Sequence, residues 1–106
     1  MAEVKFTDLA LKDLEEIATY ISHESFHFAS LQLQKIFQRT DILENFPFIG
    51  RIVPELKIRA VREIKEGNYR IIYKVISKEE IHVLTIHHSS RRLSRTYLKK
   101  ISKKEK

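Results

Sequence analysis

The sequence has no cysteine and no tryptophan, and its 106 residues include only two glycines, two prolines and one methionine. Without cysteine the chain can form neither a disulfide framework nor a thiolate metal site, which is typical of proteins of the reducing cytoplasm. Hydrophobic residues make up 42% of the chain, so the scarcity of glycine and proline indicates a folded chain rich in helices and strands. We expect one domain over residues 1–106, because this length supports a single core.

Long apolar runs are also missing. No stretch approaches the roughly 20 apolar residues that a membrane-spanning helix needs. The first residues, Met1 to Phe6, lack the basic region and the apolar run of a signal peptide. The sequence therefore predicts a cytoplasmic protein without a membrane partner.

Positive charge is concentrated at one end of the chain. Residues 1–90 contain 12 lysines and arginines against 13 acidic residues, a net charge of −1, whereas residues 91–106 contain eight against only Glu105, a net charge of +7. A nearly neutral body with a basic end favours a polyanion or an acidic protein as partner. The alternative is a solubilising tail, which we place at about residues 98–106.

The first half of the sequence has the periodicity of a strand and two helices. Val4 and Phe6 alternate with charged residues, and Thr7 or Asp8 can cap a following helix. Two apolar stripes at helical spacing then predict a helical hairpin that ends before Pro47. The stripes consist of Ala10, Leu14, Ile17, Ala18 and Ile21 in the first helix and of Ala29, Leu33, Ile36, Phe37 and Leu43 in the second.

The second half has the pattern of strands. A connector over residues 47–55 contains both prolines, and strands are expected at about 57–65, 69–76 and 81–88. Leu93, Tyr97 and Ile101 are spaced as in a short helix.

The order β-α-α-β-β-β predicts an α+β fold in which the helical hairpin packs on one face of a mostly antiparallel four-stranded sheet. A short C-terminal helix or a basic tail follows. No segment is left to cover the other face of the sheet, so an uncovered face with arginine and histidine side chains is the candidate site.

Four segments, in this order, resemble the RelE/ParE superfamily of toxins, often called plasmid stabilisation proteins. They are Gly50-Arg51-Ile52-Val53-Pro54-Glu55, Arg62-Glu63-Ile64, Gly67-Asn68-Tyr69-Arg70-Ile71-Ile72-Tyr73 and Ile86-His87-His88-Ser89-Ser90-Arg91. The resemblance covers most of the chain, including the helical hairpin. It implies the toxin component of a type II toxin–antitoxin system, which inhibits bacterial growth and is neutralised in a complex with a cognate antitoxin.

The resemblance leaves the molecular target open. RelE-type members cleave messenger RNA on the ribosome, whereas ParE members poison DNA gyrase. Our first reading is a ribosome-dependent mRNA endoribonuclease that needs no metal or cofactor. The alternatives are a gyrase poison without chemistry of its own and an inactive antitoxin-binding homologue.

Cleavage of RNA without a metal needs a ligand for the phosphate and groups that transfer protons. Arg70 matches the arginine of the Tyr-Arg motif, which is a catalytic phosphate ligand in RelE-type nucleases, and Arg91 matches their second functional arginine. Arginine suits this task because its planar, always charged group fits phosphate geometry. The alternative for Arg70 is an ion pair with Glu63 on the neighbouring strand.

Histidine, tyrosine and glutamate are the candidates for proton transfer. His87 and His88 are adjacent, so they point to opposite faces of a strand and only one can share a face with the site. Tyr97 falls where RelE-type members have a tyrosine that stacks on or activates the substrate. Glu55 matches a general base of some members, although a pairing role in the connector is the alternative. A zinc site at the histidines is not expected, because they alternate across two faces.

One departure from the RelE pattern concerns phosphate-binding lysines on the strand before the turn. Val61 and Glu63 stand at the corresponding positions, and Arg59, Arg62 or Lys65 would have to compensate. The connector instead resembles the ParE side. We expect the antitoxin to be acidic and to cover the uncovered face, the strand edges and the basic segment. The candidate residues for binding a partner or nucleic acid are Arg62, Lys65, Arg92, Arg95, Lys99 and Lys100.

Overall fold

The structure, a computed structural model that describes residues 1–105, contains three α-helices that each begin at a hydroxyl cap. Thr7 accepts a hydrogen bond from the Ala10 amide and caps α1 (Asp8–Ser22). Ser25 caps α2 (Phe26–Asp41) and Ser94 caps α3 (Arg95–Lys103) in the same way. A 3₁₀ turn, η1 (Ile42–Glu44), extends α2. None of these helices is long and apolar enough to cross a membrane.

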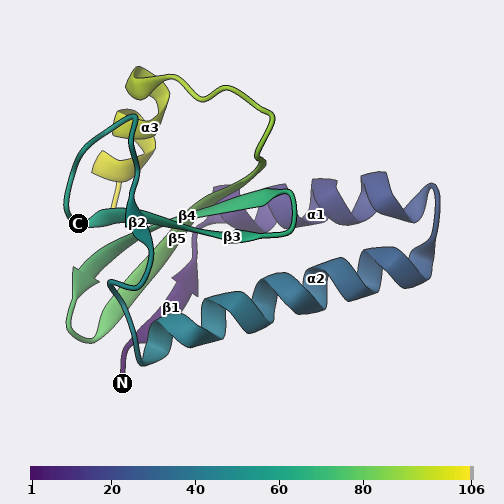
Figure 1. Cartoon of the computed structure of the whole chain (residues 1–106), viewed down its shortest axis with the longest axis horizontal. Coiled ribbons are helices and arrows are strands. Elements are labelled where there is room, and N and C mark those ends of the chain that lie inside the picture. The colour runs from purple at the N-terminus through teal and green to yellow at the C-terminus, as the bar shows by residue number, and fades with distance from the viewer. Residues whose placement is uncertain (106) are drawn as a thin grey trace.

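The strands form one sheet in the order β1-β5-β4-β3-β2 (Figure 1). Their bounds are Glu3–Phe6 for β1, Arg51–Ile52 for β2, Val61–Glu66 for β3, Tyr69–Ser77 for β4 and Glu80–His88 for β5. β1 runs parallel to β5, and the other neighbours are antiparallel. The predicted α+β class, helical hairpin and C-terminal helix are confirmed.

The sheet is covered on both faces. The hairpin of α1 and α2 packs on one face, where Leu14 and Ile36 meet Ile71 and Tyr73. On the other face a second core joins α3 to the connector and the strands (Figure 1). Its buried members are Val53, Leu56, Val61, Ile72, Leu84, Leu93 and Leu98. The prediction of an uncovered face was therefore wrong, because the C-terminal segment is an amphipathic helix whose apolar side needs a partner.

Three elements differ from the sequence-based expectation. The connector contributes a fifth strand, β2, whose two residues are too few to show a periodicity. β3 begins at Val61 and not near residue 57, since Lys57 has a φ of 57° and turns the chain out of the strand conformation. The helix α3 also continues to Lys103, through the segment expected to be a basic tail. Lys106 lies outside the described residues.

The connector approaches the sheet most closely at Gly50. Its amide donates to the buried Tyr73 hydroxyl at 3.0 Å. A Cβ at Gly50 would lie 2.5 Å from the Glu63 carbonyl oxygen and 2.8 Å from the Tyr73 hydroxyl. Only glycine fits this contact, which places β2 and the following residues beside β3.

Gly50→Ala should therefore destabilise the fold, by about 1–3 kcal/mol, because backbone atoms must move to admit the methyl group. Urea unfolding measures the loss. Gly67→Asn is the control, since Gly67 has a φ of 57° with nothing near its Cβ position and asparagine tolerates this conformation. A Gly50→Ala protein as stable as the control would contradict the close packing.

Candidate functional site

Arg70 lies at the centre of a buried ionic network. Its Nε donates to Glu63 at 2.8 Å, and Nη2 also contacts the same Glu63 oxygen. Nη1 and Nη2 donate to the two carboxylate oxygens of Glu55, each at 2.9 Å. The second Glu63 oxygen accepts from Arg51 Nε at 2.6 Å. Two arginines and two glutamates thus join the connector to β2, β3 and β4.

Burial makes these contacts strong. The side chains of Glu63 and Arg70 are only 1% and 9% exposed, so neither charge is stabilised by much water. Hydrogen bonds from Arg70 hold the pKa of Glu55 below its usual value of 4.5. The bonds to Glu55, followed by those to Glu63, raise the pKa of Arg70. Both partners are therefore ionised at neutral pH.

The guanidinium of Arg70, which the sequence suggested as a phosphate ligand, is already bonded within this network. Nε and both terminal nitrogens of Arg70 already bond to carboxylates, so a phosphate would have to displace Glu55 or Glu63. The geometry is the ion pair with Glu63 that we considered as the alternative, extended by Glu55. Glu55 itself lies where a pairing role in the connector would put it.

The cations that could replace the missing lysines of β3 are mostly engaged as well. The Arg62 guanidinium donates to the carbonyl oxygens of Arg59, Phe48 and Gly50. Both Arg59 and Arg62 lie over the Phe48 ring, at 5.0 and 4.8 Å from its centre. Lys65 is exposed on β3 opposite Arg70. Of this set, Arg62 is the cation held by hydrogen bonds, whereas Arg59 and Lys65 are exposed.

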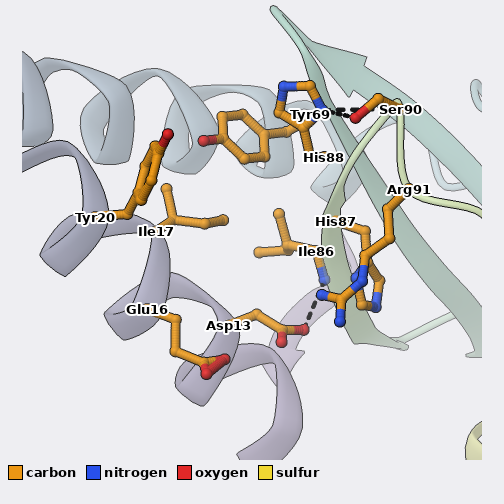
Figure 2. Close-up of a pocket in the computed structure, with 10 residues that line it drawn as sticks. All are labelled: Asp13, Glu16, Ile17, Tyr20, Tyr69, Ile86, His87, His88, Ser90 and Arg91. Atoms are coloured by element: carbon orange, nitrogen blue, oxygen red, sulfur yellow. Dashed lines mark hydrogen bonds between the residues drawn. The ribbon is translucent and has the colours of Figure 1, made fainter.

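A separate pocket of about 490 Å³ lies between α1 and the end of β5 (Figure 2). Three of the predicted catalytic residues, Arg91, His87 and His88, line it. The other lining residues are Asp13, Glu16, Ile17, Tyr20, Tyr69, Ile86 and Ser90. In Figure 2 the Arg91 side chain extends past His87 toward Asp13, and the two tyrosines face each other at the opposite end. The pocket is therefore acidic and basic on one side and aromatic on the other.

Asp13 anchors the floor of this pocket. Its carboxylate accepts from the Thr85 hydroxyl at 2.5 Å and from the Ile86 amide at 3.0 Å. β1 pairs with β5 only as far as Val83, so Asp13 takes the place of a neighbouring strand for the Ile86 amide. The residue is a structural tie between α1 and β5 as well as a charge at the pocket.

The two histidines point to opposite faces, as their adjacency predicts. His88 pairs with Tyr69 on the hairpin side, is exposed, and contacts the Ser90 hydroxyl. His87 pairs with Arg70 and packs edge-on against Tyr97 on the α3 side. His87 is 7% exposed, and within residues 1–105 its buried Nε2 has no hydrogen-bond partner.

Burial also sets the protonation of His87 and Tyr97. Desolvation lowers the pKa of His87 below 6.5, and the nearby cations Arg91 and Arg70 lower it further against the opposing effect of Asp13. Burial raises the pKa of Tyr97 above 10. At neutral pH both side chains are uncharged, which leaves His87 a poor proton donor.

The structure thus divides the predicted site residues into three groups. Arg70 and Glu55 belong to the ionic network, whereas Arg91, His87 and His88 line the pocket, and Tyr97 touches only His87 among them. Arg92, Arg95, Lys99 and Lys100 are exposed in and before α3. Arg70, His87 and Tyr97 are nevertheless neighbours on the α3 side of the sheet, because His87 pairs with Arg70 and packs against Tyr97, whereas His88 points to the opposite face.

Sequence reasoning missed the acidic and aromatic part of the pocket. Asp13 interrupts the apolar stripe of α1 between Ala10 and Leu14. A carboxylate on a buried stripe was the available signal, because buried charges need specific partners. Tyr20 and Tyr69 carried no such signal. Within residues 1–105, no group of three or more acidic or histidine side chains is arranged to hold a metal ion.

Comparison with known proteins agrees with the fold. The family described as the ParE toxin of type II toxin–antitoxin system, parDE, matches residues 4–93. No curated protein matches the chain. A solved structure described as the chromosomal ParDE TA system from P. aeruginosa superimposes with a TM-score of 0.67 at 24% identity. The match covers 83% of this chain and 96% of that one.

Arg70→Met should lower the free energy of unfolding by about 3–5 kcal/mol, because it leaves Glu63 and Glu55 without their shared partner. Arg51→Met is the matched control, since the Arg51 side chain is 60% exposed and should contribute less than about 1 kcal/mol. Urea unfolding at pH 7 measures both. The double variant Arg70→Met/Glu63→Leu should recover part of the loss. Equal losses from the two arginines would refute the buried network.

His87 should titrate below pH 6.5 in the folded protein, as followed by the NMR signal of its ring proton. The unfolded chain then binds a proton to this residue at higher pH than the folded chain does. The stability contribution is therefore complete above pH 6.5 and is lost as the pH falls toward the folded pKa. The urea-unfolded protein is the reference. A folded midpoint at or above that of the unfolded chain would be inconsistent with a buried, neutral His87.

Proposed function

The chain belongs to the ParE toxin family, and on this premise we propose that it inhibits bacterial growth by poisoning DNA gyrase, with no nuclease activity of its own. This reverses the order of the two readings drawn from the sequence. The family match supports the gyrase reading, since gyrase is the target that the ParE side of the superfamily implies. RelE-type nucleases and ParE-type gyrase poisons share this fold, so the choice between the two activities rests on individual residues.

The occupied guanidinium of Arg70 is the observation that carries the proposal. A nuclease of this superfamily needs that group to stabilise charge on the phosphate, but Glu55 and Glu63 neutralise it here. Freeing it would leave two carboxylates without their partner, one of them almost fully buried. Phosphate binding at Arg70 would therefore require these ion pairs to break, which makes it unfavourable.

The arrangement of the proton-transfer candidates supports the same choice. His88 lies on the opposite face of the sheet from Arg70, and His87, although it pairs with Arg70, is buried and uncharged. Val61 is buried in the second core, and Glu63 is bonded to two arginines, so neither position offers a cation. A poison that acts by binding another protein needs no such constellation.

The partner of a ParE-family toxin is an antitoxin. We infer that this antitoxin adds a strand at an edge of the sheet, because β1 and β2 are the edge strands and edge strands can pair with another chain. Large apolar side chains beside β2, among them Phe48, Ile49 and Ile52, are 39–58% exposed and would be covered by such a partner. Gyrase and its DNA would place the action of the toxin in the cytoplasm.

Induction of the toxin without its antitoxin should arrest a bacterial host, with loss of plasmid supercoiling before any fall in protein synthesis. Pulse labelling of protein and DNA, together with gels of plasmid topology, measures the order of events. Co-expression of the antitoxin is the control and should restore growth. Early cutting of transcripts inside coding regions would instead support an mRNA endoribonuclease. Normal growth with folded protein would indicate an inactive homologue.

The variant His88→Ala tests the nuclease reading directly, and because His88 is exposed we expect the variant to fold normally. A nuclease that used His88 in proton transfer would lose about a hundredfold or more in rate. The gyrase reading predicts toxicity equal to that of the wild type at equal protein level.

A further inference from the structure

The arginines of this chain fall into two classes. Those before residue 90 are bonded to protein groups or stacked on an aromatic ring, as described for Arg51, Arg59, Arg62 and Arg70, and Arg39 donates to the Lys65 carbonyl oxygen. Within the described chain, by contrast, no ion pair or side-chain hydrogen bond involves the cations from residue 91 onward. Glu105, whose side chain is the one carboxylate between residues 91 and 105, is held 2.5 Å from His82. These charges therefore face solvent without internal compensation.

The free cations form an ordered surface on α3. Leu98 and Ser102 are buried against the sheet, whereas Arg95, Lys99, Lys100 and Lys103 are exposed on the rest of the helix surface. We call these four residues the basic face; with Thr96 they line a shallow groove of about 410 Å³. Three of them are four residues apart, which puts them in one row at steps of about 6 Å along the helix axis.

This row is held in place although it is unfavourable for an isolated helix. Like charges four residues apart destabilise a helix by a few tenths of a kcal/mol per pair. Packing of Leu98 offsets this cost, and Lys74 caps the C-terminal end by donating to the carbonyl oxygens of Ser102 at 2.9 Å and Glu105 at 2.6 Å. The cations are thus presented on a fixed scaffold, and a bound polyanion would relieve their repulsion.

We propose that the basic face binds the phosphate backbone of nucleic acid without sequence preference. Specific protein interfaces are anchored by aromatic or aliphatic side chains, and the basic face contains none. Nucleic-acid interfaces are more polar and more positive. A DNA strand presents negatively charged phosphates at regular intervals, which a regular row of cations can contact. This inference goes beyond the proposed function and does not depend on it.

The test measures binding of the full-length toxin to a labelled DNA duplex of mixed sequence by fluorescence anisotropy, between about 50 and 200 mM salt. The triple variant Arg95→Gln/Lys99→Gln/Lys103→Gln should bind at least about tenfold more weakly. The slope of log Kd against log salt should fall by about 2–3, at about 0.9 per lost phosphate contact. All three side chains are exposed, and their removal takes away repulsion, so thermal unfolding should occur at the wild-type temperature or above.

The matched control is Lys12→Gln/Lys35→Gln/Lys78→Gln, which removes the same charge from exposed positions outside α3. It should keep nearly all of the affinity and the salt slope. Equal losses of DNA affinity in the two triple variants would mean that net charge alone causes the effect, and this would overturn the proposal. An unchanged affinity of the α3 variant would also overturn it.

A glutamate-rich peptide with the same number of charges as one strand is the second probe. It should bind far more weakly than the duplex at the same salt concentration. A peptide that binds as tightly as the duplex would overturn the nucleic-acid assignment in favour of an acidic protein. The duplex assay contains no gyrase, so its failure is distinguishable from a failure of the proposed function, which the topology and labelling experiments detect.

Discussion

The Glu63 carboxylate, almost fully buried between two arginines, is the contact on which the rest of the α3 side of the molecule depends. Its partners bring together β2, β3, β4 and the connector, which otherwise has little regular structure. A charge buried to this extent is tolerated only when its partners stay in place. The network therefore holds the connector against the sheet, and the connector in turn covers the second core beside α3. The same bonds that organise this face keep the guanidinium of Arg70 buried and paired with carboxylates.

The chain thus uses one residue type in two ways. Arginines near β3 and β4 bind carboxylates and carbonyl groups or lie over an aromatic ring, whereas those after β5 have no such partner within residues 1–105. The difference is one of surroundings, because residues 1–90 have 13 acidic residues for 12 lysines and arginines, whereas residues 91–106 have only Glu105. In a superfamily where one fold serves a nuclease and a protein poison, the contacts of individual residues distinguish members that the fold does not.

Some parts of the site could be read from the sequence and others could not. The opposite orientation of His87 and His88 follows from their adjacency in a strand. Which of them is buried does not, because β5 has a bulge at Leu84: Ile72 and Tyr73 pair with Thr85 and Val83. Val83 and Ile86 therefore face the same core, and the simple alternation is shifted by one residue. β2 was missed for a related reason, since a two-residue strand is defined by its partner and not by its own pattern.

By itself, the sequence determined the helical hairpin, the three main strands, the α+β class and the uneven charge, because periodicity, capping residues and composition are local properties. The tertiary structure alone decided which charges are neutralised. Arg70 meets Glu55, which is 15 residues away, and Asp13 meets Thr85, which is 72 residues away. Such pairings depend on how the connector and α1 lie against the sheet. The same holds for α3: its lysines could equally belong to a solvated tail, and only the core beneath Leu98 makes them one ordered face.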